Sequence, residues 1–561
     1  MSTHARPLAD RLAAASDAQL QRLLAVRAVR ADADWSDFFD AAEALLEPAS
    51  IERGLAVLTG AEARALCDAI DGRADAAVLS ELSTLGFIGA GDRVLAPVAA
   101  IVAELPPIDD AASSAETPAS DGAAARAAER AFTTIGALSD LLLAARTAPL
   151  ALVATGALSA GERRRFSAAV DLEDLREIAA LSGLARAVDR ELLITRAAEE
   201  WLAASFAPRW ARVADAFRTA LPDGIRSGRG WTPMAGWDRA HPWNPGWPAR
   251  ATRLRELAFL LGLRTPEGGE PAWTVPLRLG EDVDTSALEA QLPTEVDRVF
   301  LQNDLTAIAP GPLQPGLDNR LRAMTEHESA AQASSYRFTV DSVSRALVEG
   351  ETAQSIRTFL HELSLTGVPQ PLEYLVAQTA ARHGLVRVGP DAAGGTAVSS
   401  ADEDLLSAIE IDRNLRPMGL VRDGDRLVSR VGAETVAWAL SDARYPATLV
   451  DRDGNGVAAQ RHRIAPAAGP TGEPYAALIA RLRSRQGPDA DAAWLDRELE
   501  AAVRARAVVL VEVAMPDGSS RELTLEASGV GGGRLRGRDR AADVERTLPV
   551  RSIRSVRVLE G

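Results

Sequence analysis

Apolar residues recur at intervals of three and four through the first hundred positions, the period of helices that bury one face. The pattern covers residues 8–26 and 37–46 and continues through three segments between Ile51 and Phe87. A Gly-Asp turn and a short apolar run, GAGDRVLAPVAAIV, come next. Three helices followed by such a turn are typical of a winged helix-turn-helix. Residues 1–105 are therefore predicted to form a helical, winged-helix-like module.

A second run of the same kind occupies residues 135–206, ending in the strand-like segment ELLITRAAEEWL. The following stretch is rich in arginine and holds seven of the ten tryptophans: Trp201, Trp210, Trp231, Trp237, Trp243, Trp247 and Trp273. Prolines and glycines interrupt its centre, which predicts an ordered loop rather than a helix. Residues 129–280 are predicted to be a second winged-helix-like module with a Trp/Arg-rich loop.

The remaining pattern completes an α+β multidomain chain. Small, polar, Pro-containing stretches predict linkers at 106–128 and 452–490. Helices and strands mix through residues 285–450. From Ala507 the apolar period changes to two, with turns at regular spacing, and this predicts a small C-terminal β-barrel within residues 491–561. The glycine run GVGGG opens no helix, so it is interpreted as a turn between strands rather than a phosphate loop.

Composition narrows the possible chemistry. The 561 residues include 62 Lys plus Arg, and every one of them is arginine. A chain without lysine has no Walker A loop, no kinase ATP lysine and no Schiff-base nucleophile. We therefore expect no helicase motor, no catalytic residues and no cofactor. The lone Cys67 excludes an internal disulfide and is interpreted as a core thiol.

The chain is expected to be cytoplasmic and to have no membrane partner. Its first residues lack the apolar core of a signal peptide. The longest uncharged stretch, residues 147–161, is too short to span a bilayer and contains a proline.

No metal site is expected. Asp451 to Gly456 matches the opening of an EF-hand calcium loop, but His462 stands where the bidentate glutamate belongs. A hairpin turn explains the same residues. The histidines form no HExxH or paired spacing and are interpreted as surface or packing residues. No GxSxG elbow provides a hydrolase nucleophile.

Nucleic-acid contacts need a local basic surface, because the net charge is −16. Both presumed recognition helices lack the required side chains: DLEDLREIAAL carries four carboxylates and one arginine, and DAAVLSELSTL has no basic residue. Protein packing is the favoured role for both helices. In the second module, a phosphate contact is predicted on the preceding helix at Arg163, Arg164 and Arg165.

The strongest basic candidate is the segment GRLRGRDR near the C-terminus. Four arginines alternate there and share one face of a strand: Arg534, Arg536, Arg538 and Arg540. Arg551 and its neighbours add positive charge nearby. Guanidinium forks on one face suit phosphates, while an edge strand defended by charge against aggregation explains the same pattern. The Trp/Arg-rich loop could stack bases; a packing plug between domains is the favoured interpretation.

Three segments carry a family resemblance: FLQNDLTAIAPGPL at 300–313, the YRFT-to-TGVP stretch at 334–376, and AARHGLVRV at 380–388. Together they resemble the N-terminal domain of XPB-type DNA helicases, over about 285–450. The whole chain resembles actinobacterial helicase-associated domain proteins, which lack the motor. The last 60 residues are similar to the barrel of WYL domains, in degenerate form, because other residues replace the Trp-Tyr-Leu triplet around Arg534 to Arg536.

The resemblance implies a non-catalytic, helicase-associated protein. It would bind DNA or single-stranded nucleic acid, or a partner such as a helicase or another DNA-processing protein. The alternative is a regulator that senses a nucleotide or single-stranded nucleic acid through its WYL-like barrel.

Overall fold

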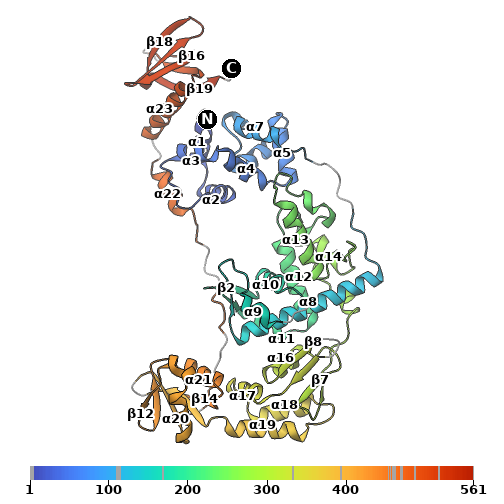
Figure 1. Cartoon of the computed structure of the whole chain (residues 1–561). Coiled ribbons are helices and arrows are strands. Elements are labelled where there is room, and N and C mark those ends of the chain that lie inside the picture. The colour runs from blue at the N-terminus through green and yellow to red at the C-terminus, as the bar shows by residue number, and fades with distance from the viewer. Residues whose placement is uncertain are drawn as a thin grey trace.

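The computed structural model describes residues 5–108, 115–166, 170–330, 334–391, 394–452, 454, 456–457, 463–467, 472–485, 488–515 and 519–559. Each of its five hydrophobic cores lies in a different part of the molecule. The mixed α+β character is confirmed. Within the described residues no helix is long and apolar enough to cross a membrane. Figure 1 shows the N-terminal helices and the C-terminal sheet close together, far from the strands and helices of residues 296–450.

The N-terminal module, residues 5–105, is helical. Capping boxes at Ser16 and Thr59 fix the starts of two of its helices. The predicted wing is reduced to one antiparallel bridge, between Ile88 and Val94. The helices are α1 (Ala5–Ala14), α2 (Asp17–Val26), α3 (Phe38–Leu45), α4 (Pro48–Ala56), α5 (Gly60–Ile70), α6 (Ala76–Thr84), the 3-10 turn η2 (Ala90–Asp92) and α7 (Ala96–Glu104).

The C-terminal part of the chain returns to complete this core. Helix α22 (Ala476–Ser484) lies within the predicted linker 452–490, so that prediction is wrong. Its buried stripe packs into the N-terminal module and consists of Tyr475, Leu478, Ile479 and Leu482. The stripe has helical spacing, i, i+3, i+4 and i+7. Its side chains are buried because the N-terminal helices, far away in the sequence, provide an apolar surface for them.

The middle module, residues 115–292, forms the largest core around a three-stranded sheet of order β1-β3-β2. Its elements are α8 (Asp121–Thr147), β1 (Leu150–Ala151), α9 (Ala160–Arg165), α10 (Leu172–Leu181), β2 (Ala185–Val188), β3 (Glu191–Ile194), α11 (Arg196–Ala203), α12 (Phe206–Ala220), β4 (Arg226–Ser227), β5 (Gly230–Trp231), the 3-10 helix η3 (Met234–Arg239), α13 (Trp247–Leu260), α14 (Thr274–Leu279) and α15 (Ser286–Glu289).

The predicted linker 106–128 is also corrected. Helix α8 begins at Asp121, and residues before it pair with residue 270: the Glu270 amide donates to the Thr117 carbonyl at 2.7 Å. The alanines of α8 are small because backbones meet there. A Cβ on Gly262 would lie 2.5 Å from the carbonyl oxygen of Ala127. The small residues here allow close packing of two backbones, although the same composition predicts a linker.

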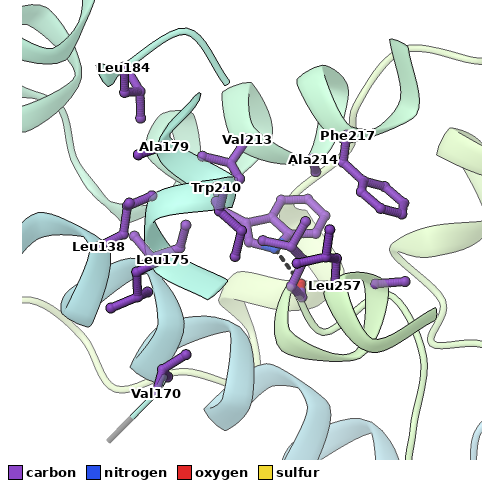
Figure 2. Close-up of a cluster of buried hydrophobic side chains, with 14 of the residues drawn as sticks. Leu138, Val170, Leu175, Ala179, Leu184, Trp210, Val213, Ala214, Phe217 and Leu257 are labelled. Atoms are coloured by element: carbon purple, nitrogen blue, oxygen red, sulfur yellow. Dashed lines mark hydrogen bonds between the residues drawn. The ribbon is translucent and has the colours of Figure 1, made fainter. Parts of the chain in front are cut away.

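All seven tryptophans of residues 201–275 are buried. Trp210 of α12 is fully buried against α8, α10 and α13. Its indole N–H donates to the Leu261 carbonyl at 2.8 Å (Figure 2). Trp243 belongs instead to the N-terminal core and donates to the Pro106 carbonyl at 3.2 Å. A packing role is confirmed, but six of the seven rings lie inside the core of the middle module rather than between domains. The predicted loop contains η3 and the start of α13.

Residues 296–450 hold two sheets, each with its own core. The first has order β6-β7-β9-β8 and the second β12-β13-β11-β10-β14. The elements are β6 (Phe300–Leu301), β7 (Thr306–Ala309), α16 (Pro315–Ala323), β8 (Glu326–Ala330), β9 (Ser334–Arg337), α17 (Val340–Val348), α18 (Ala353–Leu363), α19 (Gln370–Arg382), β10 (Val386–Pro390), β11 (Thr396–Ser400), α20 (Glu403–Ile411), the 3-10 helix η4 (Arg413–Met418), β12 (Val421–Asp423), β13 (Arg426–Ser429), α21 (Ala433–Asp442) and β14 (Ala447–Leu449).

The C-terminal sheet is open, so the predicted barrel is wrong. Its five antiparallel strands have order β18-β17-β16-β15-β19, and α23 (Pro488–Arg504) covers the apolar face. Leu499 and Ala502 of this helix pack against Val509, Val511 and Leu525, so the helix supplies the burial that closure would give. The strands are β15 (Val508–Ala514), β16 (Ser520–Gly531), β17 (Arg534–Asp539), β18 (Val544–Pro549) and β19 (Ile553–Leu559), with a 3-10 turn η5 (Val550–Ser552).

Candidate nucleic-acid interface

Strand β17 carries the predicted arginine row, and its side chains alternate strictly. Leu535, Gly537 and Asp539 are buried, whereas Arg534, Arg536 and Arg538 are exposed. The shared face follows from the two-residue period of a strand, and it points away from the covering helix α23. The two-glycine turn at Gly532 and Gly533, both at positive φ, joins β16 to β17 and confirms the interpretation of GVGGG as a turn.

Arg540 departs from the predicted row, because β17 ends at Asp539. Arg540 lies in the turn to β18 and is exposed; its backbone N–H donates to the Thr524 carbonyl at 3.0 Å. The buried Asp539 carboxylate organises this turn. It accepts from the backbone N–H of Ala541 at 3.0 Å and from the Arg546 guanidinium at 2.5 Å.

The strands on either side divide the arginine row into two parts. Arg534 lies opposite Gly531 on β16 and Pro549 on β18. The next exposed position, Arg536, lies opposite Gly529 and Thr547. No carboxylate therefore stands across the ladder from either arginine.

Arg538 has a different environment. Glu526 lies opposite it on β16 and Glu545 on β18. Its guanidinium also forms an ion pair of 2.8 Å with Asp543, and this hydrogen bond raises the pKa of Arg538. Three carboxylates thus surround the third arginine of the row and cancel its field.

Arg551 lies at the uncompensated end. It belongs to η5, where the Val550 N–H donates to the Gly533 carbonyl at 2.9 Å, beside the hairpin that carries Arg534. Arg551 is exposed, and no ion pair joins it to any described residue. This backbone contact therefore places Arg551 next to the end of the C-terminal sheet that carries Arg534 and Arg536.

The other predicted arginines lie elsewhere. Arg163, Arg164 and Arg165 are exposed at the end of α9 in the middle module, and Arg165 pairs with Glu162 at 3.0 Å. Figure 1 shows α9 well separated from the C-terminal sheet. The two basic sets do not form one surface.

The acidic helix α10 is occupied by intramolecular contacts. Arg253 of α13 reaches both Asp174 and Glu177 at 2.6 Å. The opposite side of α10 is buried against the core through Leu175 and Ile178. Its carboxylates are used to attach α13, which agrees with a packing role.

The tryptophan segment presents no ring for base stacking. All of these side chains except Trp231 donate their indole N–H to a backbone carbonyl oxygen: Trp201, Trp210, Trp237, Trp243, Trp247 and Trp273. Each is at most 7% exposed, so a base has no aromatic face to reach.

The described ranges contain no group of three or more His, Cys, Asp or Glu side chains able to hold a metal ion. Two residues of the calcium-like loop, Asp453 and Asn455, lie outside the described residues, as does His462. His241 packs in the interior with Nδ1 3.0 Å from the Leu58 carbonyl oxygen, and burial lowers its pKa.

Sequence reasoning identified the arginine row but missed what interrupts it. The Gly532–Gly533 turn could have aligned β16 with β17 and shown that Gly531 faces Arg534. The pairing of Glu526 with Arg538 could not be read in this way, because a bulge between Ala527 and Gly529 shifts the register.

Residues 299–423 match the family described as the helicase conserved C-terminal domain. The match spans β6 to β12, which is all of the first sheet of residues 296–450 and much of the second. It supports a helicase-associated protein with a role connected to nucleic acids. No curated protein matches the chain.

Proposed function

We propose that this chain is a non-catalytic, helicase-associated protein that binds nucleic acid through the exposed face of its C-terminal sheet. The observation that carries the proposal is the exposed, uncompensated group Arg534, Arg536 and Arg551, in a chain whose overall charge of −16 repels phosphate. Guanidinium groups suit phosphate oxygens, because their planar fork is pre-organised and loses little freedom for each hydrogen bond that it forms.

Three features support the non-catalytic part of the proposal. The chain has no lysine, so it has no Walker A loop. The resemblance of residues 285–450 to the XPB-type N-terminal domain implies a part that supports a motor, and the match to the helicase conserved C-terminal domain covers residues 299–423 of this region alone. The resemblance of the last 60 residues to WYL domains, in degenerate form, implies a sensing part rather than a motor. The partner would then be DNA, or a helicase or other DNA-processing protein that brings this sheet to it.

The middle module is proposed to be a winged-helix unit used for packing. The element order α8, β1, α9, α10, β2, β3 is that of a winged helix, with β2 and β3 as the wing. Because α10 uses Asp174 and Glu177 to hold Arg253, it is not free to read a major groove.

The salt dependence of DNA binding tests the proposal. Three uncompensated arginines predict a slope of log K against log salt of about −2.7 on duplex and about −2 on single strands. Replacing Arg534 and Arg536 by serine should weaken binding to all sequences alike and flatten the slope by about 1.4–1.8 units. The triple serine variant of Arg163, Arg164 and Arg165 is the control.

Two outcomes decide the assignment. If the triple variant loses the salt-dependent affinity and the sheet variant keeps it, the α9 surface is the DNA contact and the proposal fails. A sheet variant with reduced affinity and an unchanged triple variant supports it. A structural cause for lost affinity is excluded when the circular dichroism spectra of both variants equal that of the parent.

A second candidate function is a regulator that senses a nucleotide or single-stranded nucleic acid through the same sheet. The observation that favours it is the shortness of the basic end of the sheet, the end that carries Arg534 and Arg536. It covers only these two positions of β17 before carboxylates lie opposite the strand.

A further inference from the structure

The basic end of the C-terminal sheet is bounded. Along β17 the exposed positions repeat every two residues, about 6.6 Å, so Arg534 and Arg536 span a short distance before Arg538. From that position on, Glu526, Glu545 and Asp543 lie close to the path. A nucleic-acid strand that continued along β17 would bring its next phosphates over these carboxylates and be repelled.

The surface of β16 beside the basic end carries no side chains next to Arg534 and Arg536. Gly529 and Gly531 stand where side chains would otherwise flank the arginines, and a Cβ on either would meet no atom within 4 Å. On the other side the Thr547 hydroxyl accompanies Arg536 as a potential donor. A compact anion can therefore approach the backbone of β16 with guanidinium groups of Arg534 and Arg536 beside it.

We propose that this end of the sheet binds a phosphomonoester, the terminal phosphate of a nucleic-acid strand or of a nucleotide. The inference rests on the proposed function and names its ligand class. A phosphomonoester carries a charge near −2 at pH 7 and three free oxygens, whereas an internal phosphodiester carries −1 and two. Three neighbouring arginines bind a terminal phosphate more tightly, because it offers this additional charge and oxygen. The carboxylates around Arg538 repel the phosphates of a strand that continues past the site.

The test compares strand ends on the full-length protein. Fluorescent single-stranded 12-mers of one sequence are prepared with a 5′-phosphate, a 3′-phosphate or hydroxyl ends, and affinities are measured by anisotropy at pH 7.5. A phosphorylated end is expected to bind about tenfold tighter than the hydroxyl end, or ~1.4 kcal/mol. Inorganic phosphate and adenosine monophosphate serve as competitors.

Variants locate the effect. The double variant Arg534→Ser/Arg536→Ser should abolish the preference for the phosphorylated end. Arg521→Ser, which removes an exposed arginine from the opposite end of β16, should keep it. Lowering the pH from 7.5 to 5.5 should shrink the preference severalfold, because the phosphate falls toward −1 while arginine stays charged.

The outcomes separate the two proposals. Equal affinity for both ends, with salt-dependent binding still assigned to the arginines, overturns the phosphomonoester inference and leaves nucleic-acid binding intact. Binding that the double variant does not weaken overturns both. A preference that pH leaves unchanged also contradicts the inference. Adenosine monophosphate that competes at concentrations close to the Kd of the phosphorylated 12-mer assigns the free nucleotide as the source, and competition only at far higher concentrations assigns the strand end.

Discussion

Replacing Ile479 by alanine tests whether α22 is part of the N-terminal core. Ile479 is 2% exposed and belongs to the hydrophobic core of the N-terminal module, where α22 lies against α2. Truncating an isoleucine at such a site costs about 2–5 kcal/mol, because the lost contacts and the cavity add. The cost falls on the docking of α22, because Ile479 belongs to the buried stripe by which this helix packs into the N-terminal module.

Amide hydrogen exchange is the appropriate assay, since a chain with five cores does not unfold in one step. A loss of about 3 kcal/mol should speed exchange through local opening by roughly 100-fold in residues 476–484 and in the facing helices α1 and α2. The matched control is Ile464→Ala, which removes the same atoms from a side chain that is 40% exposed and should change exchange in α22 little. Unchanged exchange in the Ile479 variant would refute the docking.

Three further predictions follow from buried contacts and from composition. Burial raises the pKa of Glu498 to about 7 against the opposing charge of Arg6, with Asp10 adding to the rise. The contact of α23 with the N-terminal module should therefore weaken as pH rises from about 4.5 to 7, and Glu498→Gln should remove this dependence in melting curves. Gly230→Ala should unfold the middle module or abolish soluble expression, because the Cβ would lie 1.8 Å from the Arg278 carbonyl oxygen. The purified protein should hydrolyse no ATP with or without DNA; turnover removed by a point change in this chain would contradict the expectation.

The local pattern predicted much of the C-terminal strand and little of its surroundings. Alternation along β17 is a property of the strand itself, so the exposed face of Arg534 and Arg536 could be read from spacing alone. Spacing alone could not show whether the sheet closes into a barrel, because closure requires β18 and β19 to pair. They are the two outer strands of this sheet, and α23 covers its apolar face instead. Pairing of Arg538 with Asp543 depends on a turn held by the buried Asp539.

Composition misled where distant partners decide the structure. Alanines near Ala127 are typical of a linker until Gly262 is known to pack against them. The spacing of Leu478 and Leu482 indicates a helix, but nothing nearby in sequence offers a surface for it. Local spacing alone was sufficient for one helix of the middle module: α10 lies at residues 172–181, within the segment predicted for it.

The return of α22 to the N-terminal module has a consequence for biosynthesis. The Tyr475 hydroxyl donates to the Val29 carbonyl at 2.9 Å across 446 residues of sequence. At about 5–20 residues per second, a ribosome needs roughly 20–90 s to make the intervening chain. Throughout that time the N-terminal helices are present without the helix that completes their core, and the apolar side chains that α22 later covers are accessible to chaperones.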